Sequence, residues 1–294
     1  MANFWQQVVS GLASGGVYAL LALALVLIYR STHVVNFAQG EMAMFTTFVG
    51  WTLLHHGVPY WASFLLAVAC GFAGGVAIER IVIRPVEGRP VLTVAIVTLG
   101  LFFLIDGAAS WIWAPDLRTL PSAFPTRPVH VAGVAFSIED LCIIGVSLAT
   151  VLVLWLFFRF TKLGLAMRAA AREPQSSRLV GVRVGWMLAL GWGFAAALGA
   201  VAGMLAAPPL GSFDQNLMQP ILLYAFAGAV LGGLESPAGA VVGSLSLGVF
   251  LNLLGTYVDF VGTDLRLPVA LGVILGVLLV KPTGLFGRTA LRAA

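Results

Sequence analysis

The chain has 294 residues, of which 60% are hydrophobic and only 10% are charged, and its mean hydropathy is +1.00. A soluble domain carries about 25% charged residues, so an ordinary soluble protein is excluded. The net charge of +4 does not indicate a nucleic-acid partner, because the cations lie in loops between long apolar runs. These runs are continuous and do not alternate with period two, so they predict an all-α polytopic membrane protein and not a β-barrel.

Nine apolar segments follow one another along a single transmembrane domain that covers residues 1–294. They predict a bundle of about eight to ten transmembrane helices. Two segments are suspect as complete crossings. Segment 36–54 begins with polar residues, and its apolar remainder spans only about 20 Å, which suggests a half-helix or re-entrant start. Segment 219–234 is short and is followed directly by Glu235, Ser236 and Pro237. The segments are 8–29, 36–54, 59–81, 92–113, 139–160, 186–207, 219–234, 238–257 and 265–281.

Positive charge is distributed unevenly when these segments are threaded alternately with the N-terminus outside. Thirteen of the 16 Lys and Arg residues then fall inside, and only Arg118, Arg127 and Arg266 fall outside. The positive-inside rule favours this orientation. It places loop 161–184 and the C-terminus in the cytoplasm, and the proline-rich loop 114–138 over the external mouth. Five tryptophans then form an aromatic belt near the outer boundary, namely Trp5, Trp51, Trp61, Trp111 and Trp113.

No catalytic or metal-binding pattern is visible in the sequence. There is no G-x-x-x-x-G-K-[ST] phosphate loop, H-E-x-x-H, G-x-S-x-G or clustered Cys/His set. His55 and His56 form an isolated pair in a short turn. The prediction is a chain that is not an enzyme, holds no metal and needs no cofactor of its own.

Polar residues within the apolar segments are the candidates for a translocation pathway, because an ionisable group in a bilayer is costly. Glu41 lies in the first third of segment 36–54 together with the amides Asn36 and Gln39. Broken helices with such polar groups hold polar solutes in transporters. The alternative is an interfacial loop in which Asn36 caps a helix. Asp106 either faces the pathway or belongs to a packed helix interface. The candidates for the pathway or its gate are Ser14, Tyr18, Asn36, Gln39, Glu41 and Asp106.

Residues 161–184 form the longest polar stretch between apolar segments. Between Arg159 and Arg183 lie six of the chain's 16 cations, with Glu173 as the one acid. The alanine-rich run 166–172 predicts a short helix, and Pro174 a break and a new helical start. The second helix, 174–180, should end at Gly181, a natural residue after a helix terminus. A basic orientation loop would explain the charge, but not this order of helix, proline, helix and glycine.

Four stretches resemble permease subunits of ABC importers of the branched-chain amino-acid type. The loop RAAAREPQSSRLVGV resembles the segment that couples such permeases to their ATPases. Residues 36–42 (NFAQGEM) are similar to the signature after the first span of the first of two permease types. Residues 231–240 (LGGLESPAGA) resemble the family's Gly-rich turn, and KPTGLFG its usual ending. The sequence departs from the family pattern at residues 45–47 (FTT) and 175–177 (QSS).

The resemblance implies a heteromeric importer in the bacterial inner membrane. Its other parts would be a second, dissimilar permease, two cytoplasmic ATP-binding subunits and a periplasmic substrate-binding protein. The solute would be a branched-chain or related amino acid, a small amide or an aromatic acid. The alternative is a stand-alone ion-coupled carrier or channel with Asp106 or Glu41 as its ion site. The residues expected to couple to the ATPase are Gly164, Met167, Arg168, Arg172, Glu173, Pro174, Ser177, Leu179 and Gly181.

Overall fold

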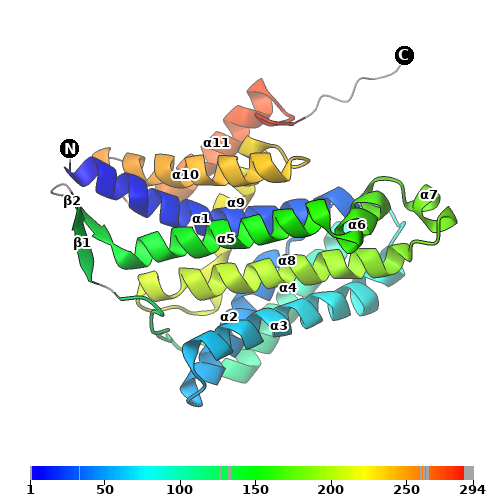
Figure 1. Ribbon diagram of the computed structural model, residues 1–294, viewed down its shortest axis with the longest axis horizontal. Helices are drawn as coiled ribbons and strands as arrows, with labels where there is room; N and C mark the ends of the chain where they lie inside the picture. Colours follow the sequence, from blue (N-terminus) through cyan, green and yellow to red (C-terminus); the bar gives the residue numbers. More distant parts are fainter. Residues whose placement is uncertain are drawn as a thin grey trace.

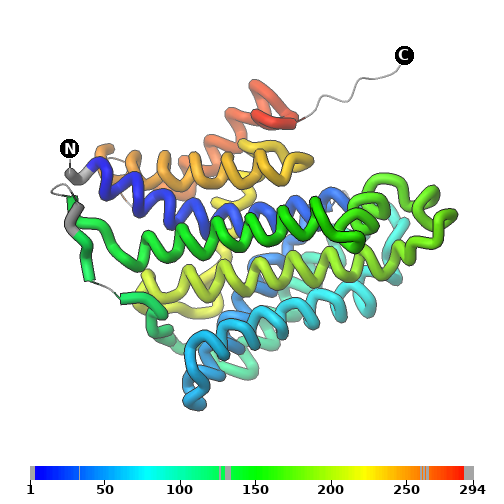
Figure 2. The backbone as a smooth tube through the Cα atoms, in the orientation of Figure 1, coloured from blue at the N-terminus to red at the C-terminus, as the bar shows by residue number. Residues whose placement is uncertain are grey.

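The computed structural model describes residues 2–32, 34–125, 127–131, 134–258, 260, 262 and 265–287. Long helices run side by side along one axis (Figure 1). At the centre lie α1 (Ala2–Thr32) and α8 (Val184–Ala206), whose most apolar stretches are 78% and 72% buried. Figure 2 shows the start of α1 and a short hairpin at one end of the bundle, and residues 161–184 at the other. We call these the hairpin end and the coupling end.

The peripheral helices present apolar side chains to their surroundings. They are α3 (Tyr60–Ile78), α4 (Val91–Trp113), α5 (Ile138–Phe160), α10 (Pro237–Tyr257) and α11 (Arg266–Val280). On α4 the exposed side chains include Leu92, Phe103 and Trp111. Hydrocarbon is an adequate solvent for these side chains, so burial inside the bundle is unnecessary. A π-helical turn (Glu79–Ile83) and a 3₁₀ turn (Arg84–Val86) extend α3.

Each of the nine predicted segments contains a helix, which confirms the all-helical membrane class. Within the described part, six helices are long and apolar enough to cross a membrane: α1, α3 with its extension, α4, α5, α8 and α10. The others, α2 (Gln39–His55), α9 (Met218–Gly232) and α11, have 17, 15 and 15 residues. Because a crossing takes about 20 residues, a count of eight to ten crossings stays a prediction.

Two of the short helices begin inside the bundle. Residues 34–38 are not helical, as the polar start of segment 36–54 suggests, and the Gln39 side-chain amide then donates to the Ala195 carbonyl at 2.9 Å. Since Ala195 is halfway along α8, α2 begins near mid-depth. A Cβ added to Gly40 would lie 3.5 Å from the Met218 carbonyl oxygen and 3.2 Å from the Leu222 side chain, so Gly40 lies beside the start of α9. The starts of α2 and α9 therefore meet in the middle of the molecule.

The loop at 114–138 contains a β-hairpin that the sequence did not predict. Strand β1 (Pro128–Val131) pairs antiparallel with β2 (Val134–Ser137), and Val129 lies opposite Phe136. Strands of four residues interrupted by proline give too short a pattern to detect. The loop is tied to the chain after α8 by two backbone hydrogen bonds between Arg118 and Phe213, of 2.9 and 2.8 Å.

Candidate functional site

Two short helices follow α5 at the coupling end, as predicted. They are α6 (Lys162–Arg172) and α7 (Pro174–Leu179). The predicted start of the first helix at residue 166 is wrong, because α6 begins four residues earlier. Thr161 caps it: the Thr161 hydroxyl oxygen accepts the Gly164 backbone N–H at 2.9 Å. The chain therefore turns directly from α5 into α6 without a flexible connection.

The predicted punctuation of the second helix is also confirmed. Glu173 is non-helical, with φ −134° and ψ 76°, and Pro174 is the first residue of α7. After α7, Gly181 has φ 83°, and its N–H donates to the Arg178 carbonyl at 3.1 Å. The Val182 N–H donates to the Ser177 carbonyl at 3.0 Å. This pair of bonds is a Schellman motif, whose left-handed position favours glycine.

Close packing holds α6 against the bundle. A Cβ added to Gly164 would lie 2.5 Å from the Phe157 carbonyl oxygen and 2.6 Å from the Phe158 Cα, so only glycine allows α6 to lie this close to α5. Met167 on α6 and Ser177 on α7 are also buried. Three of the predicted coupling residues therefore position the two helices and do not contribute to their exposed surface.

The remaining coupling residues are exposed. Leu179 at the tip of α7 is 89% exposed, and its neighbour Val180 is 78% exposed. Apolar side chains in a polar, cationic segment are typical of a surface that contacts another protein. The other predicted coupling residues on this surface are Arg168, Arg172, Glu173, Pro174 and Gly181.

A second anchor, which the sequence analysis missed, holds the other end of the segment. Arg84 donates to the Gly185 carbonyl at 2.6 Å and forms a 3.4 Å ion pair with the buried Glu79. The Arg80 guanidinium lies 3.4 Å from the centre of the Trp186 ring. The start of α8 is therefore fixed to the end of α3. The sequence offered one signal for this anchor: Arg80 and Arg84 are four residues apart, so they lie on the same face of a helix.

Three of the predicted pathway residues lie together, fully buried, where α2 begins. Asn36 donates from its side-chain amide to the Gln39 side-chain oxygen at 3.3 Å. The Asn36 side-chain oxygen accepts the Ala38 N–H at 3.1 Å, which closes a turn before α2. The alternative interpretation, in which Asn36 caps a helix, is wrong, because Ala38 is the N-cap residue of α2. Gln39 reaches α8, as described above. These amides fasten the unwound stretch 34–38 to the centre of the bundle.

Glu41 is buried in the first turn of α2, and the structure brings Asp106 near it. Within the described residues neither Glu41 carboxylate oxygen has a hydrogen-bond partner of good geometry. Asp106 on α4 and Gln219 on α9 are close enough to act on this carboxylate. The sequence analysis did not predict a role for Gln219, although this polar residue is the first residue of segment 219–234. Acidic and amide groups of three helices, α2, α4 and α9, therefore influence one another near the start of α2.

Tyr18 belongs to a different polar group. Its ring centroid lies 5.1 Å from that of Tyr224 on α9, and Arg266 at the start of α11 acts electrostatically on both phenols. Ser14 is half-buried one turn before Tyr18 on α1. The ring contact of Tyr18 therefore connects α1 with α9.

Two stretches that carry the family resemblance pack on each other at the coupling end. The Leu285 N–H donates to the Leu231 carbonyl at 2.8 Å, and the Phe286 N–H donates to the Gly232 carbonyl at 3.1 Å. The tail KPTGLFG thus covers the Gly-rich turn between α9 and α10. The two motifs form one structural unit although about fifty residues separate them.

Comparisons with known proteins agree with this architecture. The family model described as "Branched-chain amino acid transport system / permease component" matches residues 7–280. The chain is 32% identical to the high-affinity branched-chain amino acid transport system permease protein BraD of Pseudomonas aeruginosa, over 97% of this chain and 96% of that protein. It is 31% identical to the permease protein LivH of Escherichia coli strain K12, with the same coverage.

A solved structure shares the fold at a greater distance. It is PsaBC from Streptococcus pneumoniae in complex with Fab, at a TM-score of 0.50 and 14% identity, covering 95% of this chain and 92% of that one. At this identity the likeness concerns the fold alone. The family match covers residues 7–280, which include α6 and α7, and the two relatives align over 97% of the chain. The chain therefore belongs to the family of branched-chain amino acid transport system permease components.

Proposed function

We propose that this chain is a permease subunit of an ATP-driven importer for branched-chain or related amino acids, small amides or aromatic acids. A periplasmic binding protein delivers the solute. A second, dissimilar permease completes the pathway, and two cytoplasmic ATP-binding subunits drive it, in the bacterial inner membrane with residues 161–184 facing the cytoplasm. The observation that carries the proposal is the α6–α7 pair, which is clamped at both ends and exposes Leu179 and Val180 at its tip.

The clamps explain how this pair can transmit movement. Residues 161–184 dock in a groove of an ATP-binding subunit, and closure of the ATPase pair displaces them. Because Gly164 lies on the backbone of α5, a movement of α6 moves α5. Because Arg84 holds Gly185, the same movement reaches α3 and α8. A flexible loop at this position would absorb the movement without transmitting it.

The meeting point of α2 and α9 supports a pathway for a small zwitterion. Helix N-termini carry partial positive charge, and broken helices in transporters direct these ends at anionic groups of the solute. Here two such ends lie beside the carboxylates of Glu41 and Asp106 and the amide of Gln219. An amino acid offers a carboxylate to the helix ends and an ammonium group to the acids. We therefore assign Glu41, Asp106 and Gln219 to the pathway.

Isolation of the chain from its native membrane tests the proposal. We expect it to copurify with a second permease and an ATP-binding subunit, and the complex in liposomes to take up solute only with ATP and the binding protein. Uptake by the chain alone, driven by an ion gradient, would establish the ion-coupled carrier and refute the importer. In the complex, Leu179→Asp should abolish copurification of the ATPase. Leu117→Asp, which also changes an exposed leucine but in the loop at 114–138, should leave copurification of the ATPase intact.

A further inference from the structure

A cavity of about 510 Å³ lies near the coupling end, away from the proposed pathway. Its walls come from α1, α5, α8 and α10, and α6 closes one end. Most of the lining is aliphatic or aromatic, and several of these side chains are open to the surroundings of the bundle. Leu152 is 53% exposed, Trp155 50% and Val242 47%. The cavity is therefore a lateral groove that faces the bilayer.

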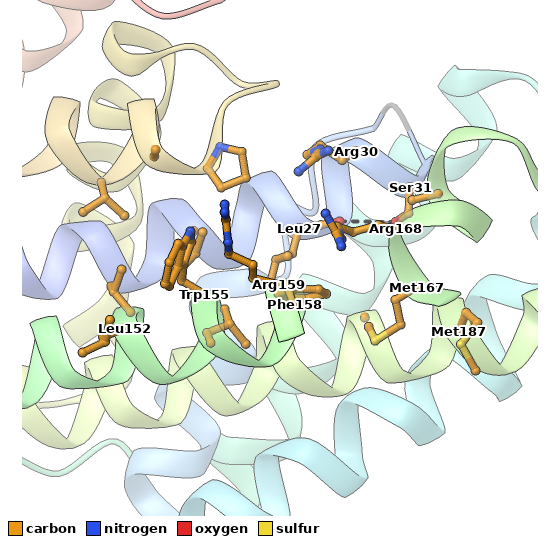
Figure 3. Close-up of a pocket in the computed structure, with 18 of the residues that line it drawn as sticks. Leu27, Arg30, Ser31, Leu152, Trp155, Phe158, Arg159, Met167, Arg168 and Met187 are labelled. Atoms are coloured by element: carbon orange, nitrogen blue, oxygen red, sulfur yellow. Dashed lines mark hydrogen bonds between the residues drawn. The ribbon is translucent and has the colours of Figure 1, made fainter. Parts of the chain in front are cut away.

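Three arginines from three helices gather in this groove. Figure 3 shows Arg30 of α1, Arg159 of α5 and Arg168 of α6 between Trp155 on one side and Met167 on the other. They lie at the end of the groove toward α6. The groove thus has an apolar part along the helices and a cationic part where the helices end.

No acidic side chain in the described part of the chain forms an ion pair with a groove arginine. Among the described residues, the ion pairs are Arg84–Glu79 and Arg118–Asp116, and neither involves a groove arginine. Glu235 acts on Arg30, but Arg168 and Arg172 act on it with the opposite sign. The Arg159 guanidinium lies 5.3 Å from the Trp155 ring and 5.7 Å from the Phe160 ring, and both rings are half-exposed or more.

We infer that this groove binds an anionic phospholipid of the cytoplasmic leaflet. Its phosphate would lie among Arg30, Arg159 and Arg168, and one acyl chain would lie along Leu152 and Trp155. Guanidinium groups bind phosphate through paired N–H donors, and basic pockets between helices at the cytoplasmic surface suit anionic headgroups. A free anion would use the arginines but not the apolar wall. A zwitterionic lipid would fill the wall but leave the positive charge unbalanced.

The position of the groove gives such a lipid contact with the coupling helix. Met167 and Arg168 of α6 line it together with Leu27 and Arg30 of α1. A bound lipid would therefore touch α1, α5 and α6 at once. The inference uses the orientation proposed above, but its test measures lipid retention, so it can fail while the transport proposal stands, and the reverse.

The test is native mass spectrometry of the purified chain, and of its assembled complex, from nanodiscs with equal amounts of phosphatidylglycerol and phosphatidylcholine. We expect wild type to retain one phosphatidylglycerol in both forms. Each arginine near an anionic headgroup contributes about fivefold in affinity, so Arg30→Gln with Arg159→Gln should lower retention about 25-fold. Arg89→Gln removes an exposed cation on the same side but outside the groove, and should change nothing.

A second variant decides the question if the double variant does not fold. Leu152→Trp fills the apolar part of the groove without changing the charge, and it should also release the lipid. Equal retention of both lipids would overturn the inference. So would retention that is unaffected by both variants, or displacement of the lipid by millimolar inorganic phosphate, which would indicate a free-anion site. Loss of the lipid on assembly would show that a partner subunit occupies the groove, which also overturns it.

Discussion

Replacement of Gly164 by alanine tests whether close packing of α6 on α5 transmits movement from the ATPase. The added Cβ would lie 2.5 Å from the Phe157 carbonyl oxygen, while ordinary contacts begin at 3.4 Å, so α6 must move by about 1 Å. Both nearby atoms belong to the backbone of α5 and cannot rotate away. Overpacking of this kind costs about 1–3 kcal/mol. For a chain of 294 residues that cost corresponds to a fall in Tm of roughly 2–5 °C.

Coupling should be affected more than folding. A change in a coupling contact alters the energy between two sites by about 0.5–2 kcal/mol, so uptake per ATP hydrolysed should fall roughly 2- to 30-fold. The assay is ATP hydrolysis and solute uptake measured together in proteoliposomes that hold the complex. Gly145→Ala is the matched control, because a Cβ at this position of α5 meets nothing within 4 Å. The free energy of unfolding of this control should be unchanged or higher by up to about 1 kcal/mol, and its Tm should not fall.

The result that would refute the reasoning is a Gly164→Ala complex with the Tm and the uptake-to-ATP ratio of wild type. The close approach of α6 to α5 would then be adaptable, and α6 could not be a rigid transmitter. A lowered Tm with an unchanged ratio would limit Gly164 to a structural role. Only a fall in the ratio that Gly145→Ala does not share supports transmission through this contact.

Three further substitutions have expected outcomes. Gly181→Val puts a branched residue at φ 83°, which should lower stability by about 1–2 kcal/mol and weaken copurification of the ATPase. Gly181→Asn should be tolerated, because asparagine also adopts the left-handed conformation. Equal ATPase binding by both variants would contradict the Schellman assignment. Arg84→Ala leaves Glu79 buried and unpaired and should lower stability by about 3 kcal/mol in thermal unfolding, an effect that Arg84→Ala with Glu79→Gln should partly reverse. Glu41→Gln removes a buried carboxylate without a hydrogen-bond partner, so Tm should not fall. Solute uptake should drop about tenfold. Unchanged uptake would show that Glu41 is not part of the pathway.

Local chemistry made the coupling segment predictable from the sequence. Pro174 can begin a helix but not continue one, and Gly181 accepts the left-handed conformation that ends α7. These properties belong to the residues themselves, so the order of the two helices is confirmed. The alanine pattern predicts the start of α6 four residues too late, because the start depends on the Thr161 hydroxyl and nothing in that pattern reports this contact.

The pathway residues were predictable as a class but not as a group. Glu41 and Asp106 stand out because charge in an apolar segment is rare. Their proximity, and the contribution of Gln219, follow from α2 and α9 beginning at the same depth. Tyr18 lies against Tyr224, a neighbour that the sequence does not indicate, because the rotation of α1 about its axis is set by packing against its neighbours. Helix rotation has no signal in a sequence that is apolar on every side.

The sequence by itself determined the membrane class, the positions of nine helices and the punctuation of residues 161–184. Each of these depends on a residue's own free energy of transfer or backbone preference. Only the tertiary structure decided that α2 and α9 meet at their starts, that Arg84 holds the beginning of α8, and that three arginines share one groove. These features join residues far apart in the chain, and contact between distant helices depends on how closely their backbones approach, which is a property of the packed bundle.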